Sequence, residues 1–183
     1  NVVDEANLKV SNSPTNGYAL TAQSGNTGGM TWSAVGGANT PIVRAVPSGN
    51  QSISASTNTV VTFNTEIVDS DNAFASNLFT VPSGKAGQYF ASATVISNPG
   101  VDNALLRVQF VRNINSSGAD VNVCYGNYRM VNHESNTITI FGIVDLAAAD
   151  TLRLNYYSYQ NGSTIKGNGE YVGGTSFNIF KLI

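Results

Sequence analysis

From Thr40 to the end of the chain, apolar and polar residues alternate with a period of two, the period of a β-strand that has one face in a core. The segment 104–112 illustrates the alternation: one face takes Leu106, Val108 and Phe110, and the other takes Arg107, Gln109 and Val111. Segments with this pattern, each predicted to form a strand, are 60–67, 88–96, 104–112, 120–130, 137–144, 151–159 and 175–183.

Turn-forming residues separate these segments, as in 82–84, 98–100, 115–118 and 161–163. Short strands at regular spacing with turns between them are typical of an all-β sandwich or barrel. Only the stretch 144–150 could hold a helical turn, and it fits equally well as a strand that ends in a loop. The expected fold class is therefore all-β, an antiparallel β-sandwich.

Two of the predicted strands are apolar on both faces. In 137–144, Ile138 and Ile140 lie on one side and Phe141 and Ile143 on the other. In 151–159, Leu152, Leu154 and Tyr156 oppose Tyr157 and Tyr159. A strand of an antiparallel sheet usually has one face in water, so the second face is expected to meet another surface, most simply another copy of the chain.

The first 40 residues have a different texture, because turn formers such as Asn16-Gly17 and Gly36-Gly37 interrupt every apolar run. Isolated hairpins are marginal in water, so the apolar side chains of this part need cover from elsewhere. These side chains are Leu8, Val10, Tyr18, Leu20, Met30 and Trp32. We divide the chain into a neck-like extension, residues 1–40, and a head domain, residues 41–183; a loose linker is the alternative for the first part.

Charge is scarce in this chain. Only 11% of its 183 residues are charged, against about 25% in an average domain, and Asn, Ser, Thr and Gly make up about two-fifths of it. With a net charge of -2 there is no basic stripe, so we expect no nucleic-acid partner. No apolar run approaches the roughly 18 residues of a membrane span, so we expect no membrane insertion.

Few residues offer reactive chemistry. Cys124 and His133 are the only cysteine and histidine, which is too few for a structural metal site. No nucleophile and orienting acid accompany His133 in the local sequence, and the close acids Asp69 and Asp71 fit a solvated turn better than a calcium site. We therefore predict no catalytic residues, no metal and no cofactor.

Several segments in order carry a family resemblance. Residues 61–64, 76–82 and 86–90 look like the signature F…N…FTvP..GxYxF, and 144–154 looks like the turn motif L..GD.l.L with Ala149 at the glycine position. Residues 175–180 resemble a closing sFsgfl strand. These segments resemble the trimeric jelly-roll superfamily of tumour necrosis factor and the complement globular heads. The resemblance implies a jelly-roll sandwich that assembles as a homotrimer.

The first part of the chain has a resemblance of its own. Residues 8–10, 14–21 and 28–32 look like a segment found ahead of the terminal domain in bacteriophage fibre proteins. The two resemblances together imply a non-enzymatic homotrimeric head of a virion fibre or spike, on the virion surface. Its neck would join other virion proteins, and its head would attach to a receptor, a glycan or another component of the host surface.

Two residue sets follow from this interpretation. The predicted trimer interface consists of Phe90, Ser92, Ile138, Ile140, Tyr157 and Phe180. The predicted receptor contacts are Asp71, Asn115, His133, Tyr159, Asn161 and Tyr171. The alternatives are a decoration or connector protein of the virion without a receptor, a fibre-borne glycan hydrolase, and a secreted signalling ligand of the same superfamily.

Overall fold

A computed structural model describes residues 9–25, 28–34, 39–132, 134–167 and 174–182. The chain divides into two compact units, Asn1–Ala38 and Asn39–Ile183. Each unit has its own strands and is described by itself. Leu8, His133 and Tyr171, which entered the predictions above, lie outside the described residues.

The first unit contains one antiparallel hairpin, β1 (Tyr18–Ala22) and β2 (Met30–Ala34). The side chain of Asn12 joins the segment that precedes β1 to strand β2. Its Oδ1 accepts hydrogen bonds from the backbone N of Trp32 at 2.7 Å and from Thr31 Oγ1 at 2.9 Å. None of the described residues of this unit is fully buried. The hairpin therefore has no core of its own among those residues, as expected for so short a segment.

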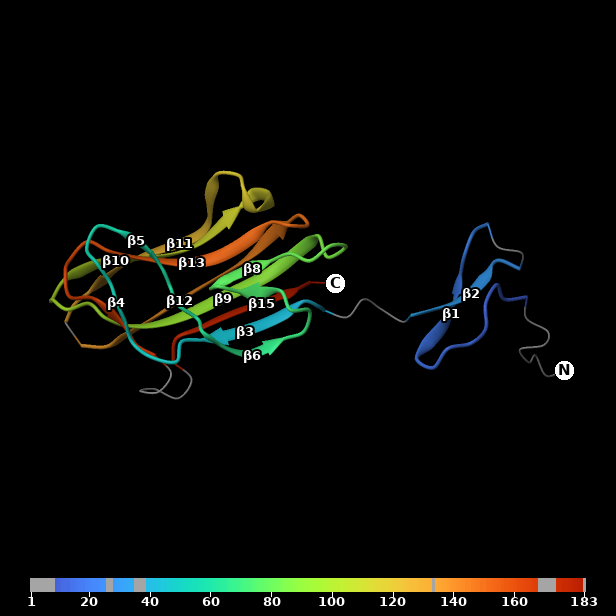
Figure 1. Ribbon diagram of the computed structural model, residues 1–183, viewed down its shortest axis with the longest axis horizontal. Coiled ribbons are helices and arrows are strands. Elements are labelled where there is room, and N and C mark those ends of the chain that lie inside the picture. Colours follow the sequence, from blue (N-terminus) through green and yellow to red (C-terminus); the bar gives the residue numbers. More distant parts are fainter. Residues whose placement is uncertain (1–8, 26–27, 35–38, 133, 168–173, 183) are drawn as a thin grey trace. The chain divides into compact units, whose positions relative to one another are not determined.

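The second unit is a sandwich of two antiparallel sheets (Figure 1). Sheet I has the order β12-β9-β15-β3-β6, and β14 and β4 extend it beside the end of β9. Its strands are β3 (Ile42–Val46), β4 (Gln51–Ser52), β6 (Thr65–Asp69), β9 (Gly87–Asn98), β12 (Asn136–Leu146), β14 (Thr164–Ile165) and β15 (Ser176–Lys181).

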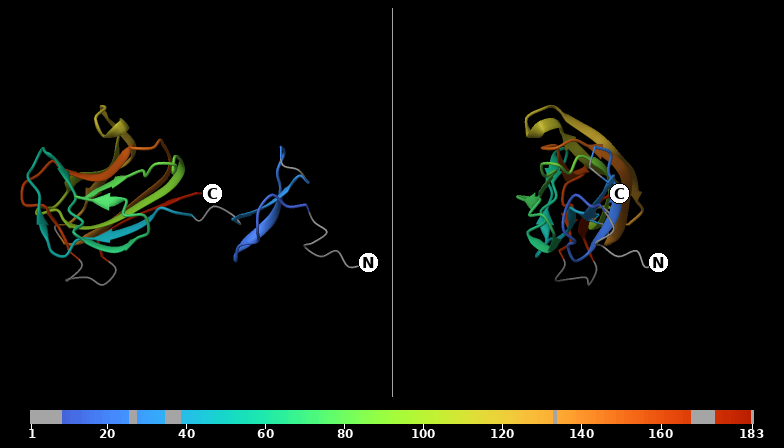
Figure 2. Two further views of the ribbon diagram at one scale, coloured as in Figure 1. Left: turned by 45° about the vertical axis from the view of Figure 1, so that its right-hand side comes forward. Right: turned by 90° about the vertical axis from the view of Figure 1, so that its right-hand side faces the viewer.

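Sheet II has the order β11-β10-β13-β8-β7, and β5 pairs with β13. Its strands are β5 (Asn58–Val60), β7 (Phe74–Ala75), β8 (Leu78–Thr80), β10 (Ala104–Asn113), β11 (Asp120–Met130) and β13 (Thr151–Ser158). A 3-10 turn, η2 (Ile114–Ser116), follows β10 and stands out from the sandwich (Figure 2). The described residues contain no helix long and apolar enough to cross a membrane.

The expected strand 60–67 is wrong in one respect. The chain leaves sheet II after β5 and joins sheet I only at β6, so residues 61–64 cross between the sheets. Backbone N–H groups on the crossing segment still find partners: Val61 N donates to Leu154 O at 2.9 Å, and Phe63 N donates to Asn77 Oδ1 at 2.6 Å. Val61 and Phe63 point into the core, which explains why the alternation continues through the crossing.

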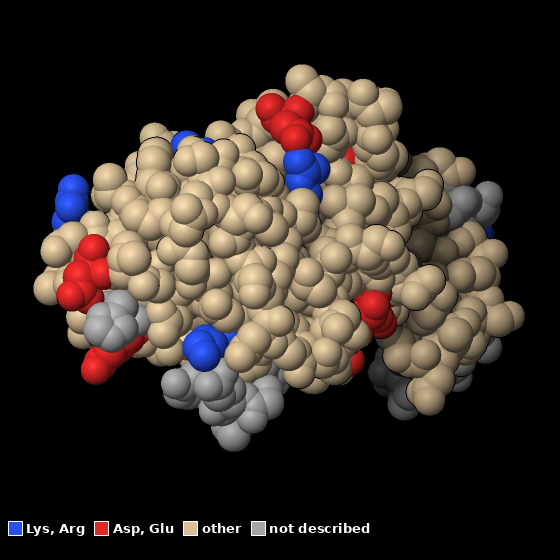
Figure 3. All heavy atoms as spheres, turned by 60° about the vertical axis from the view of Figure 1, so that its left-hand side comes forward, with Lys and Arg blue, Asp and Glu red and all other residues tan. Residues whose placement is uncertain are grey.

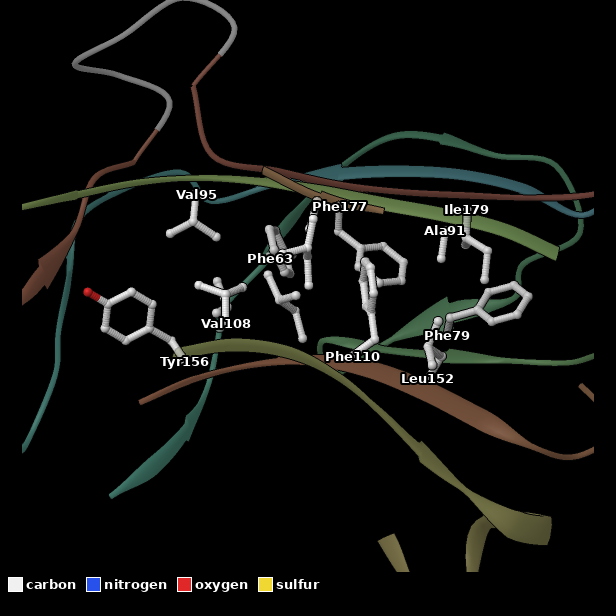
Figure 4. Close-up of a cluster of buried hydrophobic side chains, with 14 of the residues drawn as sticks. Phe63, Phe79, Ala91, Val95, Val108, Phe110, Leu152, Tyr156, Phe177 and Ile179 are labelled. Atoms are coloured by element: carbon white, nitrogen blue, oxygen red, sulfur yellow. The ribbon is translucent and has the colours of Figure 1, made fainter. Parts of the chain in front are cut away.

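The core lies between the two sheets and consists of the inward residues of each strand (Figure 4). Phe177 of β15 is central to it, because its ring lies 5.5 Å from Phe74, 5.8 Å from Phe63 and 6.0 Å from Phe110. Burying one such ring contributes about 1.5–3 kcal/mol. This unit therefore buries an apolar core of its own.

The stretch 144–150 is a strand followed by a tight turn rather than a helical turn. β12 ends at Leu146, and Ala149 in the turn has φ +66°, the left-handed region that glycine occupies without strain. The carboxylate of Asp150 closes the turn by accepting hydrogen bonds from Ala147 N at 2.8 Å and Asn115 N at 3.1 Å, and it pairs with Arg112. Burial would raise the pKa of Asp150, but these hydrogen bonds and the guanidinium outweigh it and lower the pKa.

The register also defines two ends of the sandwich. Phe180 pairs with Ile42, so the chain enters and leaves the unit at one end, here named the basal end. The turns 82–86, 113–119 and 147–150 lie at this basal end, because Gly87 pairs with Leu146 and Asn113 with Thr151. Asn98 and Thr164 pair at the opposite, distal end.

Candidate functional site

The outer surface of sheet I is apolar where an outer surface is ordinarily polar. Ile143, Phe90, Phe180 and Ile42 stand in one row across β12, β9, β15 and β3. Phe141 flanks the row, and its ring centroid lies 6.4 Å from that of Phe90, which lies 5.4 Å from that of Phe180. Phe141 is 66% exposed and Ile143 63%. These five residues are named the apolar face.

The neighbouring row of sheet I is mostly polar without being charged. It runs from Phe141 through Ser92 and Asn178 to Arg44, the one charge in it. Charged residues make up only 11% of the chain, and those visible in the view of Figure 3 lie scattered. Arg44 lies in the row on one side of the exposed rings and Asp145 in the row on the other side. An exposed apolar centre with charges only at its margins has the composition of a protein interface.

The outer surface of sheet II carries two adjoining hollows, of about 350 and 410 Å³, which share Arg107, Gln109 and Asn122. Together they are named the groove. The remaining lining residues are Asn58, Val60, Val111, Asp120, Tyr125, Asn127, Arg153, Asn155 and Tyr159. Apart from two valines, every lining side chain has a polar group.

The strand register explains how the groove forms. Gln109 on β10 lies between Tyr125 on β11 and Asn155 on β13. Arg107, two residues away on the same side of β10, lies between Asn127 and Tyr157. Polar outward positions of three paired strands thus meet on one surface.

Gln109 is the most buried polar residue of the groove, at 3% exposure. Its Nε2 donates a long hydrogen bond, 3.4 Å, to Asn58 Oδ1, and its Oε1 has no partner among the described residues. Arg107 reaches the same Asn58 Oδ1 from Nη2 at 3.3 Å, while its Nε has no partner in that part of the chain. Buried polar atoms are ordinarily paired, so the hydrogen bonding of the groove is incomplete in the free chain.

Aromatic rings hold the Arg107 guanidinium in position. Its central carbon lies 4.9 Å from the centre of the Tyr157 ring, and Tyr157 packs edge-to-face against Tyr159 at 4.7 Å. A guanidinium over a tyrosine face gains about 0.5–1 kcal/mol at an exposed site. The ring therefore fixes the direction of the charge without neutralising it.

The other arginine of the groove is already paired. Arg153 forms an ion pair with Asp120 and donates from Nε to Asn155 Oδ1 at 3.3 Å. Asp120 also accepts a hydrogen bond from Asn113 Nδ2 at 3.0 Å, and this bond together with the Arg153 guanidinium lowers the pKa of its carboxyl. Asp120 is the only acid that lines the groove, so the lining does not supply the two carboxylates of a glycoside hydrolase.

The structure separates the residues predicted for the trimer interface. Phe90, Ser92 and Phe180 lie together on the outer side of sheet I, as one surface. Ile138 and Ile140 are buried in the core, at 1% and 5% exposure, so their assignment to an interface is wrong. The exposed side of β12 is formed by Phe141 and Ile143 instead, because successive residues of a strand point to opposite faces.

Tyr157, the sixth predicted interface residue, lies on the other sheet. It points outward from β13 beside the groove, under the Arg107 guanidinium. It therefore does not share a surface with Phe90 and Phe180, and the prediction of one continuous interface from all six residues is wrong.

The predicted receptor contacts are also spread over the unit. Asp71 and Asn115 lie at the basal end, where Asp71 pairs with Lys85 at 3.6 Å and Asn115 N reaches Asp150. Asn161 lies in the turn after β13, at the distal end, and Tyr159 lines the groove. The carboxylate of Asp69 accepts hydrogen bonds from Ala73 N and Phe74 N, both 2.9 Å, so it is engaged in a turn.

Three residues of the groove were not among the predicted site residues: Asn58, Gln109 and Asn122. A signal was present for one of them, since Gln109 occupies an outward position in a strongly apolar stretch. Asn58 and Asn122 could not be linked to it without the strand pairing, because they lie on β5 and β11, far away along the chain.

No protein-family model matches the chain, and no curated protein matches it. Solved structures do resemble the chain in fold. The globular domain of zebrafish complement 1qA protein aligns with a TM-score of 0.58 and 14% identity over 78% of this chain and 98% of that one. Murine APRIL aligns with a TM-score of 0.58 and 14% identity over 77% of this chain and 98% of that one. The similarity shows the fold, and the predicted antiparallel jelly-roll sandwich is confirmed.

Proposed function

We propose that this chain is a non-enzymatic, homotrimeric binding head that attaches a larger particle to a saccharide receptor on a host surface. One observation carries the proposal: the two outer surfaces of the sandwich have opposite chemistry, an apolar face on sheet I and a polar groove with tyrosines on sheet II. The first suits assembly and the second suits a ligand.

Assembly through the apolar face has a clear driving force. Fully burying a phenylalanine or isoleucine side chain contributes about 1.5–3 kcal/mol, and Phe141 and Ile143 are both more than half exposed in the single chain. Three copies that place this face toward a common axis close the assembly and leave no further copy of it open. The jelly-roll fold and the resemblance to trimeric heads support the number three.

The groove stays accessible in such an assembly. It lies on sheet II, on the side of the sandwich opposite the apolar face. Three identical weak sites on one particle bind a receptor-bearing surface far more tightly than one site, by a factor of about 10²–10⁴ when the geometry permits. A shallow polar site is sufficient for attachment under these conditions.

The place of the head on a virion fibre or spike is part of the proposal. Its support is the resemblance of residues 8–32 to segments that precede the terminal domain of bacteriophage fibres. The hairpin β1–β2 has only half-buried or exposed side chains among its described residues, as suits a segment covered by other chains. In this proposal, residues 1–40 join the head to other virion proteins.

Light scattering and saccharide binding on the 183-residue chain test the proposal together. We expect about three times the 19.2 kDa chain mass, and binding to a glycan array that disappears when the protein is denatured. A stable monomer contradicts the trimer. An intact trimer that binds no saccharide contradicts the attachment function and supports a connector.

A further inference from the structure

We infer that the groove of sheet II binds a saccharide that carries a carboxylate, and that Arg107 is the residue that binds the carboxylate. This inference rests on the proposed attachment function and adds the chemical class of its ligand. Four features of the groove carry it: an unpaired charge, a fixed guanidinium, a set of amides, and exposed tyrosine rings.

The Arg107 guanidinium is the one charged group that lines the groove and has no counter-charge among the described residues. Arg153 and Asp120 neutralise each other, and no carboxylate lies within ion-pair distance of Arg107 among the described residues. A partly buried guanidinium with only one weak hydrogen bond from Nη2, at 3.3 Å, has lost water without gaining a counter-charge. An anionic group on the ligand supplies that counter-charge.

A carboxylate fits Arg107 better than a more highly charged group does. One guanidinium binds one carboxylate through two parallel N–H···O hydrogen bonds. Phosphate groups of nucleic acids need several cations side by side, and the groove offers only one that is unpaired. The Tyr157 ring already orients the guanidinium plane, so little conformational entropy is lost on binding.

The rest of the lining suits the hydroxyl groups of a sugar. Asn122 and Asn127 offer amide groups that can both donate and accept hydrogen bonds. Gln109 lies beneath these amides: its Oε1 has no contact with solvent, and its Nε2 donates to Asn58 Oδ1, the atom that also accepts from Arg107 Nη2.

Tyr125 and Tyr159 are 63% and 47% exposed at the edge of the groove. Their rings offer flat apolar surfaces, with a hydroxyl at the rim. The C–H face of a pyranose ring can pack on such a surface.

The test compares probes that differ only in the carboxylate. Binding of the 183-residue chain is measured by calorimetry with trigalacturonic acid and its methyl ester, and with sialyllactose and lactose. We expect at least one acidic probe to bind, and its neutral partner to bind at least about tenfold more weakly, the loss of one charge-assisted hydrogen-bonded contact.

Two variants locate the charge. Arg107→Gln is expected to weaken the acidic probe at least about tenfold and to leave a neutral probe unchanged. Arg129→Gln is the matched control, because Arg129 is an outward cation on β11 that does not line the groove. Its expected effect is less than twofold. If Arg107→Gln does not fold, the comparison of acid with ester on the unaltered chain still decides.

The possible failures are distinguishable. Equal binding of acidic and neutral saccharides, or equal effects of the two arginine variants, overturns the carboxylate assignment and leaves the attachment function standing. A preference for sulfated over carboxylated saccharides on the array also overturns it. A trimer that binds no saccharide of any kind overturns the attachment function as well.

Discussion

The outward positions of sheet I and sheet II are equivalent in the alternation of their strands, yet they are occupied in opposite ways. On sheet I, Phe141 and Ile143 are apolar and more than 60% exposed; on sheet II, Gln109 and Asn155 are polar and no more than 6% exposed. Each is the reverse of what an outer surface ordinarily shows. Exposed apolar patches and buried polar groups are the informative exceptions in a protein, and here they are the basis for proposing assembly on sheet I and ligand binding on sheet II.

This comparison predicts that one charge on the apolar face has the largest effect of any substitution considered. Phe141→Glu places a carboxylate beside the ring of Phe90, where a contact between copies would have to bury it. We expect the light-scattering mass to fall from three chains to one.

The control for this change is Val131→Glu. Val131 is 79% exposed in the turn between β11 and β12, outside the apolar face, so the same introduced charge should leave the trimer intact. If Phe141→Glu remains a trimer, or if both variants dissociate alike, the apolar face is not the specific assembly surface.

The two ion pairs of sheet II provide the second prediction, because one belongs to the fold and the other to the groove. Asp150 has a fully buried side chain and pairs with Arg112, whereas Asp120 is half exposed beside the groove. Removing one partner of a buried pair costs about 3 kcal/mol or more, and an exposed pair contributes under about 1 kcal/mol. We therefore expect Asp150→Asn to be strongly destabilising and Asp120→Asn nearly neutral, in urea unfolding at one fixed protein concentration.

The lowered pKa of Asp150 gives the same pair a pH signature. Its carboxyl titrates below its ordinary value of 3.8 in the folded chain, so its stabilisation is fully present above that value and is lost as the pH falls through the lower folded-state pKa. We expect the stability difference between the unaltered chain and Asp150→Asn to be constant from pH 7 to pH 5 and to shrink below about pH 4. A difference that does not depend on pH would mean that the carboxylate charge is not what stabilises the turn.

How far the sequence predicts this fold depends on what alternation can report. Alternation identified the long strands, and the motif resemblance led to a jelly roll that the solved structures support. Alternation gave a wrong strand at 60–67. A segment that crosses between the sheets keeps its inward residues, Val61 and Phe63, in the same core, so it alternates as a strand does. A period of two reports which residues share a side, not which sheet the backbone joins.

The same limit explains the errors at the sites. The sequence shows that β12 has two apolar sides but not which of them is inward, so Ile138 and Ile140 were assigned to an interface although they point into the core, and Phe141 and Ile143 form the exposed side. The groove depends on pairing β10 with β11 and β13, which lie at quite different distances along the chain. No local pattern around Gln109 could name its neighbours.

A smaller prediction concerns the turn that joins β12 of sheet I to β13 of sheet II. Ala149 has φ +66°, a conformation that costs a residue with a Cβ about 1 kcal/mol relative to glycine. Ala149→Gly is expected to raise the free energy of unfolding by up to about 1 kcal/mol. Ala147→Gly is the control, since Ala147 is not among the residues with positive φ, and a gain from both changes would show that the strain at position 149 is not the cause.

The smallest expected change in stability bears most directly on the difference between the two sheets. Gln109 is buried, donates only one long hydrogen bond and leaves its Oε1 unpaired, so it contributes little to folding. Replacing a poorly paired buried polar group with an apolar one of similar size is ordinarily neutral or stabilising. Gln109→Leu should therefore leave the free energy of unfolding within about 1 kcal/mol of the unaltered chain, or raise it.

Saccharide binding measured on the same Gln109→Leu protein completes the comparison. We expect a loss of about tenfold, because the variant removes the hydrogen bond from Gln109 Nε2 to Asn58 Oδ1, the atom that also accepts from Arg107 Nη2 and helps to position the guanidinium. Val108→Ala, an inward neighbour on β10, is the opposite control: it should lower stability while leaving the affinity of the folded protein unchanged. If Gln109→Leu instead unfolds the protein, the polar side chain of Gln109 is required for folding. The outer surface of sheet II then serves stability, as its core side does, and not ligand binding.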